Sequence, residues 1–302
     1  MEVLGRLLAM LAVLLLGAGL RSSGLLNAAR TARLNATAYY VALPALVFVA
    51  TYDQPVSELL STELLAGSLV VVFATGGIAW VAHRNRFSQG RRSVAIIQSY
   101  HSNLGYLGVP LVAATFDARV TAIASVILGF VTLIQLPLTI VVLSVFNGAN
   151  AAIVRELKNL ATNPVLGALL AGLAIGEVGL VIPATVTAGL DALGALSLPL
   201  ALLCVGAALQ VDSPSLDLEA TGSVVALKLG CMPLLAWAVF SLLAVDAATF
   251  TASVVMLGMP TAVSTYVYAS ELGGDAEFAS LNVFATTVAS VATLFVLITM
   301  IG

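Results

Sequence analysis

Apolar residues run through this chain in long blocks that are separated by short polar segments. A helix needs about 20 mostly apolar residues to cross a bilayer. Ten blocks suit that requirement, and we expect one membrane-spanning helix in each: residues 3–20, 35–52, 62–82, 92–114, 119–146, 163–182, 185–209, 220–244, 248–270 and 279–301. The pattern therefore predicts an all-α membrane fold with ten transmembrane helices.

Composition supports a membrane protein. Of the 302 residues, 60% are hydrophobic and 9% are charged, whereas about 25% are charged in a soluble domain. The first block also has small residues near its end, at Gly17–Gly19, which would suit a cleaved signal peptide. However, Glu2 precedes the only nearby base, Arg6, and a signal peptide begins with a positively charged region. We therefore interpret the first block as a helix.

The loops differ in charge. Three of them hold most of the basic residues: Arg21, Arg30 and Arg33; then Arg84, Arg86, Arg91 and Arg92; then Arg155 and Lys158. The loop between the second and third blocks instead carries Asp53, Glu58 and Glu63. Because short loops rich in lysine and arginine stay on the cytoplasmic side, we expect a multi-pass protein of the cell membrane with both termini outside.

A short motif recurs in the two halves of the chain. LGVP at Leu107–Pro110 returns as LGMP at Leu257–Pro260. We predict two related halves of five helices, residues 1–147 and 163–302, joined by a cytoplasmic linker, residues 148–162. An odd number of helices turns the second half upside down relative to the first. The linker is either an amphipathic surface helix or an ordinary polar connection, and both interpretations stay open.

The recurring motif predicts two broken helices, the fourth and the ninth. Glycine and proline free backbone groups that hydrocarbon cannot satisfy, so such a break survives only against protein or a watery cavity. In inverted repeats the broken helices cross near the midplane, where their ends form a binding site. Neither helix carries a central lysine or arginine. We therefore expect helix ends and amides, without a fixed cation, to hold a small anion there.

Polar residues lie before the first predicted break and after the second. Asn103 can both donate and accept hydrogen bonds, which suits an anionic or zwitterionic ligand. The alternative is that Asn103 and Ser102 only join helices. The candidate substrate-binding residues are Asn103, Ser102, Gly108, Pro110, Gly258, Pro260, Thr261, Ser264 and Thr265.

A second set of residues forms a candidate ion or supporting site: Gln98, Ser99, His101, Asp191 and Lys228. Ionisable groups inside apolar helices are generally functional. Asp191 and Lys228 also lie near helix ends, where such side chains can reach water, so both interpretations stay open. His101 is either a proton relay or a neutral, hydrogen-bonded imidazole.

The sequence gives little support to enzyme classes. It has two histidines, two cysteines in apolar blocks and no H-E-x-x-H motif, so no catalytic constellation, metal site or disulfide framework can be identified. We expect neither catalysis, nor a resident metal or cofactor, nor a nucleic-acid partner.

Several motifs resemble the auxin efflux carrier (PIN-like) family, in order along nearly the whole chain. They are LPALVF at 43–48, N-x-x-x-x-G-x-P-L at 103–111, NPVLGALLAGLAIG at 163–176, LDALGALSLPLALLCVGAAL from Leu190, KLGCMP at 228–233 and ASEL ending at Leu272. The chain lacks the long cytosolic loop of plant members, which puts auxin itself in doubt as the substrate.

This resemblance implies a five-plus-five inverted repeat in which the fourth and ninth helices cross at the substrate site. Asn103, Pro110 and Pro260 would take the binding-site and crossover positions. Helices one, two, six and seven would form a scaffold and the face of a homodimer, and the other six would move. We therefore expect a carrier, in the efflux direction, that moves a small organic anion across the lipid bilayer by an elevator-type mechanism. The alternative is a sodium- or proton-coupled symporter or antiporter, with oxygen ligands from Gln98, Ser99, Asn103, Thr261 and Thr265.

Overall fold

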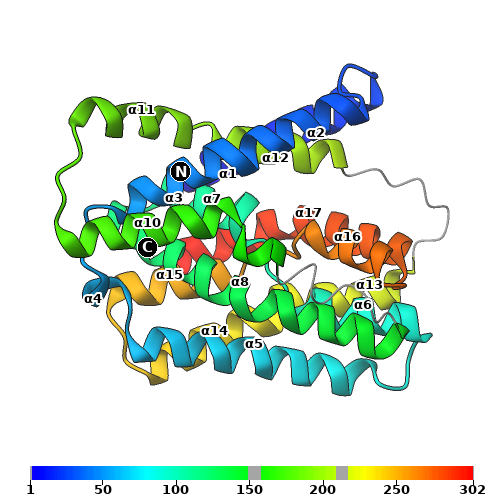
Figure 1. Ribbon diagram of the computed structural model, residues 1–302. Helices are drawn as coiled ribbons and strands as arrows, with labels where there is room; N and C mark the ends of the chain where they lie inside the picture. The colour runs from blue at the N-terminus through cyan, green and yellow to red at the C-terminus, as the bar shows by residue number, and fades with distance from the viewer. Residues whose placement is uncertain (1, 149–157, 209–216, 302) are drawn as a thin grey trace.

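The computed structural model describes residues 2–148, 158–208 and 217–301, and every regular element in these ranges is a helix (Figure 1). The α-helices are α1 (Glu2–Ser22), α2 (Ala28–Thr37), α3 (Leu43–Thr51), α4 (Val56–Leu59), α5 (Thr62–His83), α6 (Gln89–Tyr100), α7 (Val109–Thr115), α8 (Ala118–Asn147), α10 (Pro164–Val178), α11 (Ala184–Gly194), α12 (Ser197–Ala208), α13 (Leu218–Val225), α14 (Met232–Leu242), α15 (Ala247–Leu257), α16 (Ser264–Glu271) and α17 (Ala276–Ile301). Three π-helical segments join some of them: η1 (Ala38–Ala42), η2 (Leu104–Gly108) and η3 (Ala226–Cys231).

Seven helices within these ranges are long and apolar enough to cross a membrane. They span Ala28–Thr51, Thr62–His83, Ala118–Asn147, Lys158–Val178, Ala184–Ala207, Glu219–Leu242 and Ala276–Ile301. The other predicted blocks give shorter apolar helices, Leu8–Ser22, Leu104–Thr115 and Ala247–Leu257. The all-α membrane architecture is thus confirmed, and the ten-helix repeat remains a prediction. Part of the predicted linker, residues 149–157, lies outside the described residues.

A π-helical segment precedes each of three prolines, Pro44, Pro110 and Pro233. Proline has no N–H, and its ring collides with the carbonyl four residues earlier. In each case the residue before the proline donates its N–H to the carbonyl five residues earlier. This wider turn lets the helix continue past the proline.

The first predicted break is therefore misplaced. We expected it at Gly108 and Pro110, but η2 carries the helix through Gly108, and Pro110 lies in the first turn of α7. The interruption comes earlier, at 101–103, between α6 and η2. The second break is where it was predicted, because α15 ends at Leu257 and α16 begins at Ser264.

The helices form two groups. In the first, α1 packs against α12, and α3 packs against α10 and α11; in the second, α5 packs against α6 and α14, and α8 packs against α6 and α15. Figure 1 shows α1, α2, α11 and α12 along one side of the molecule and α5 and α14 along the opposite side. Segment η2 packs against α12 of the first group and α8 of the second.

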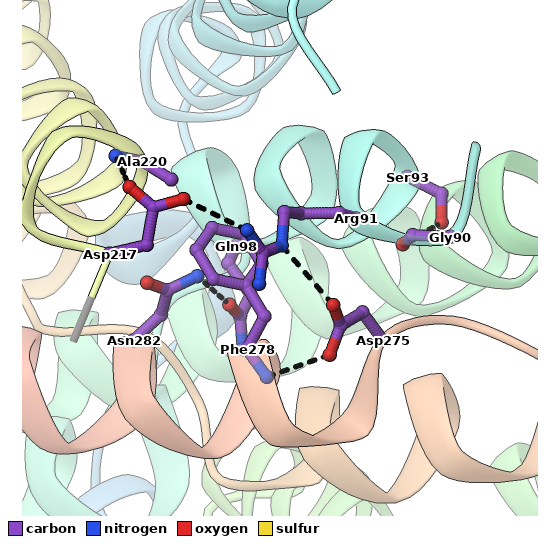
Figure 2. A network of polar contacts seen from close by, with 9 residues as sticks. All are labelled: Gly90, Arg91, Ser93, Gln98, Asp217, Ala220, Asp275, Phe278 and Asn282. Carbon is purple, nitrogen blue, oxygen red and sulfur yellow. Dashed lines mark hydrogen bonds and ion pairs between the residues drawn. The ribbon is translucent and has the colours of Figure 1, made fainter. Parts of the chain in front are cut away.

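An arginine joins the helices α6, α13 and α17 at one end of the bundle (Figure 2). The Arg91 guanidinium lies 2.8 Å from an Asp217 oxygen and 3.2 Å from an Asp275 oxygen. Asp217 also caps α13 through the Ala220 N–H, and Asp275 caps α17 through the Phe278 N–H. The starts of α6, α13 and α17 are therefore fixed to one another.

Candidate functional site

The two interrupted helices cross as a pair of extended segments. The Asn103 N–H donates to the Pro260 carbonyl at 2.8 Å, and the Ala262 N–H donates to the His101 carbonyl at 3.0 Å. Ser102 and Thr261 thereby face each other as an antiparallel bridge. The backbone N–H and carbonyl groups that lose their helical partners at the two breaks thus hydrogen-bond to one another. An irregular backbone at membrane depth requires such partners. The two interrupted segments are therefore joined by backbone hydrogen bonds.

Gln135 on α8 completes the backbone pairing on one side. Its side-chain oxygen accepts from the Ser102 N–H at 3.1 Å, and its side-chain nitrogen donates to the Ser102 carbonyl at 3.2 Å. Next to it on α8, Thr139 lies 2.8 Å from His101 Nδ1 and 3.2 Å from the Tyr100 hydroxyl. These side chains fix the first segment against α8.

Lys228 reaches the crossing from η3. Its side chain is fully buried, and its nitrogen donates to the Ser102 hydroxyl at 2.7 Å and to the Leu257 carbonyl at 3.0 Å. Within the described ranges, no carboxylate lies at ion-pair distance from it. The expectation of a crossing without a fixed cation is therefore corrected, because the predicted eighth helix brings a lysine to the end of α15.

Gln98 organises the polar residues behind the second segment. Its amide nitrogen donates to the Thr265 hydroxyl and to the Ala279 carbonyl, both at 2.9 Å, and its oxygen accepts from Asn282 at 2.8 Å. The Thr261 hydroxyl donates to the Gln98 carbonyl at 2.8 Å. Figure 2 shows Gln98 and Asn282 on adjacent helices. Four buried residues from α6, α16, α17 and the second break thus form one network.

A cavity of about 150 Å³ adjoins the crossing. One wall comes from the second group of helices and includes His101, Ser102, Asn103, Gln135 and Ser264, together with Thr132 and Tyr268. The other wall comes from the first group, through Tyr39, Leu43, Asn163, Val165 and Leu166. The cavity therefore lies between the two groups.

Asn103 has a distinctive position in this cavity. The residue is 3% exposed, and its side-chain nitrogen is buried without a hydrogen-bond partner among the described residues. Such a group costs about 1–3 kcal/mol when it stays unpaired. Its amide nitrogen is therefore available as a hydrogen-bond donor to a ligand.

The structure does not bring every predicted residue to the cavity. Asp191 is exposed on α11 and does not line it. The Ser99 hydroxyl donates back to the Ala95 carbonyl within α6. Gly108 lies against Met256, whose sulfur would be 2.9 Å from an added Cβ, and Gly258 ends α15. Both glycines thus allow close packing behind the crossing.

Several residues at the site were missed by the sequence analysis, chiefly Gln135, Thr139 and Asn282. A sequence signal did exist, because Gln135 and Asn282 are amides inside long apolar helices, where polar side chains usually face the bundle interior. Their positions in the sequence do not indicate that they contact the crossing.

Comparisons with known proteins point to one family. A family model described as "Membrane transport protein" matches residues 2–158 and 149–298. The chain is 26% identical over 291 residues to an "Uncharacterized transporter" of Methanothermobacter thermautotrophicus. This alignment covers 95% of this chain and 94% of the relative. It is also 26% identical over 273 residues to a "Putative malonate transporter" of Rhizobium meliloti, covering 86% of this chain and 84% of the relative. With its apolar spanning helices, this chain is a multi-pass membrane transporter that belongs to the membrane transport protein family, that of the auxin efflux carriers and PIN-like proteins.

Proposed function

We propose that this protein is a secondary transporter of a small organic anion and that the substrate binds in the cavity at the helix crossing. The observation that carries this proposal is the position of the cavity, which has one wall in each group of helices. A substrate held there changes its access to the two sides when one group shifts against the other.

Three features of the crossing favour an anion. Asn103 offers an amide N–H that has no partner in the described part of the chain. Ser102 lines the cavity and accepts from Lys228, whose protonated amine would supply positive charge directly behind it. The helix α16 begins beside the cavity with Val263 as its N-cap, which makes no side-chain capping bond, and a helix N-terminus attracts negative charge.

The size of the cavity favours a small substrate, because drug-sized ligands fill pockets of about 300–1,000 Å³. One relative is named for malonate, a short dicarboxylate. We therefore propose a small carboxylate as the substrate class and malonate as the first compound to test.

We further propose the complete architecture as ten helices in an inverted repeat, with halves 1–147 and 163–302 joined by residues 148–162. Helices α1, α2–α3, α10 and α11–α12 would form the scaffold and the face of a homodimer. The other helices would move together as an elevator in the cell membrane, in the efflux direction, with both termini outside. The Arg91 contacts with Asp217 and Asp275 support such joint movement, since they tie α6, α13 and α17 together.

The substitution Asn103→Ala tests the site. We expect it to weaken malonate binding at least tenfold and to leave the purified protein folded and monodisperse, since the Asn103 amide nitrogen has no hydrogen-bond partner among the described residues. Thermal shift in detergent measures both properties, because ligand at 100 times its Kd stabilises the native state by about 2.7 kcal/mol.

Gln98→Ala is the matched control for this test. Gln98 makes three side-chain hydrogen bonds, so its loss should lower the melting temperature without ligand. If Asn103→Ala unfolds the protein as Gln98→Ala does, Asn103 has a structural role instead. Unchanged binding by a folded Asn103→Ala variant would contradict the proposed site.

Ion coupling is a second candidate function, a sodium- or proton-coupled symporter or antiporter. The observation in its favour is the Asn282 side-chain oxygen, which is buried without a partner in the described ranges and lies on the residue that contacts Gln98. An unpaired oxygen beside other amide and hydroxyl oxygens suits a small cation. Uptake into proteoliposomes with and without a sodium or pH gradient distinguishes coupled from uncoupled transport.

A further inference from the structure

A second cavity, of about 310 Å³, lies where the ends of α5 and α8 meet the start of α6. Its lining includes Trp80, Arg84, Gln89, Arg92, Val145 and Phe146. It shares no lining residue with the cavity at the crossing. This basic pocket is at the end of the bundle that the positive-inside rule places in the cytoplasm.

The two arginines of the basic pocket carry uncompensated charge. Arg92 donates one bond to the Phe87 carbonyl at 3.0 Å, and its Nε is buried without a partner among the described residues. Among the described residues, neither Arg84 nor Arg92 has a carboxylate within ion-pair distance. The neighbouring Arg86 and Arg91, by contrast, pair with acidic residues. A buried donor on a guanidinium that has no carboxylate partner within the described ranges suits a bound anion.

The other wall of the basic pocket is aromatic and apolar. Trp80 packs edge-to-face on Phe146 with 5.2 Å between ring centroids, and the Arg92 guanidinium carbon lies 5.9 Å from the Phe146 centroid. Trp80 is 48% exposed, and Val141 and Val145 on α8 are 45% and 73% exposed. In a spanning helix such side chains face lipid, and tryptophan is typical of the membrane interface.

We propose that the basic pocket binds the phosphate headgroup of an anionic phospholipid. Arg84 and Arg92 would hold the phosphate oxygens, because guanidinium groups match phosphate geometry, and the acyl chains would lie on the exposed valines of α8. The α6 helix also begins at Gln89, and its N-cap Ser88 makes no side-chain capping bond, so free N–H groups add positive potential. A free phosphate ion would use the arginines but not the apolar wall.

Trp80 allows a direct test. The chain has two tryptophans, so Trp237→Phe leaves Trp80 as the only strong fluorophore beside the basic pocket. We expect brominated phosphatidylglycerol in mixed micelles to quench Trp80 at about tenfold lower mole fraction than brominated phosphatidylcholine, since each basic residue near a surface adds about 1 kcal/mol of attraction to anionic lipid.

In the Trp237→Phe background, Arg84→Gln with Arg92→Gln should abolish this preference for phosphatidylglycerol. Arg30→Gln with Arg33→Gln removes the same charge from α2, on the same predicted side, and it should leave the preference intact. Equal quenching by both lipids in the Trp237→Phe protein would overturn the proposal. It would also be overturned if inorganic phosphate alone raised the melting temperature through Arg84 and Arg92 while the protein did not distinguish the lipids.

Discussion

Lys228 places a buried ammonium group at the crossing. A buried ammonium without a carboxylate is costly, because its desolvation is not repaid by an opposite charge. Here it has hydroxyl, carbonyl and thioether acceptors, from Ser102, Leu257 and Met232. Under the proposed function, a substrate anion next to Ser102 would supply the missing opposite charge.

Replacing Lys228 by methionine tests this interpretation. Lys228→Met keeps the length of the side chain and removes the charge, and the Leu257 carbonyl can still accept from the Ser102 hydroxyl, which lies 3.4 Å away. We expect malonate binding to fall at least tenfold. The melting temperature without ligand should stay equal or rise, because exchanging a buried charge for an apolar group of similar volume is often neutral or stabilising. Isothermal titration and thermal unfolding measure the two effects.

The only other lysine in the chain, Lys158, provides the control. It is exposed at the end of the linker region, so Lys158→Met should bind malonate like the unmodified protein. Unchanged binding by Lys228→Met would exclude Lys228 from anion recognition.

At the residue level, sequence identified the composition of the site better than its contacts. Ser102, Asn103, His101 and Ser264 were predicted because polar residues are rare in spanning helices, and all four line the cavity. Lys228 was a candidate with an open role, because its distance from Ser102 depends on how the helices pack. The sequence alone does not contain that packing.

At the level of elements, the prolines were interpreted too simply. Pro110 was expected to break its helix, yet a π-helical segment accommodates it. The chain opens at Ser102 instead, where Gln135 and the second broken helix supply partners for the freed backbone groups. A break in a membrane helix thus forms where such partners exist, and these come from distant parts of the chain. Pro260 needed no such correction, because no helix continues through it.

The packing of α1 on α12 depends on two glycines. A Cβ added to Gly206 would lie 2.0 Å from the Leu14 carbonyl oxygen, and one added to Gly17 would lie 2.4 Å from the Leu203 carbonyl oxygen. Small residues at such positions allow the close approach of membrane helices. We expect Gly206→Ala to push the two helices apart and to cost about 1–3 kcal/mol, the usual penalty for overpacking.

Gly19 offers a control on α1 itself, since a Cβ added there meets nothing within 4 Å. Gly19→Ala should leave the melting temperature unchanged or raise it, because alanine favours a helix over glycine by about 1 kcal/mol. Thermal unfolding of the two variants in the same detergent gives the comparison. Equal melting temperatures would show that contact between α1 and α12 does not limit stability.

At the scale of the whole molecule, the polar ends of the helices fall into two sets. The loop after α5, the end of α8 and the starts of α13 and α17 gather at one end of the bundle, where Arg86 pairs with Glu219 and Arg91 pairs with Asp217 and Asp275. The opposite end has fewer bases, and Arg119 there pairs with Glu58. The sequence analysis predicted a basic end and a less basic end, because the charge of a loop can be read from its own residues. The two groups of helices and the cavity between them depend on packing across the whole chain, which no local pattern encodes.

Cysteine labelling tests the resulting sidedness. Cys204 and Cys231 are free cysteines, and replacing both by alanine gives a background without reactive thiols. Asn85, in the loop after α5, and Ser57, on the short helix α4, are exposed at opposite ends of the bundle. We expect a membrane-impermeant maleimide to label Ser57→Cys in intact cells, and to label Asn85→Cys only after the membrane is permeabilised. Labelling of Asn85→Cys in intact cells, with Ser57→Cys protected, would reverse the orientation. The basic pocket would then face the outer leaflet, whereas the malonate site at the crossing would be unaffected, since it lies between the two helix groups in either orientation.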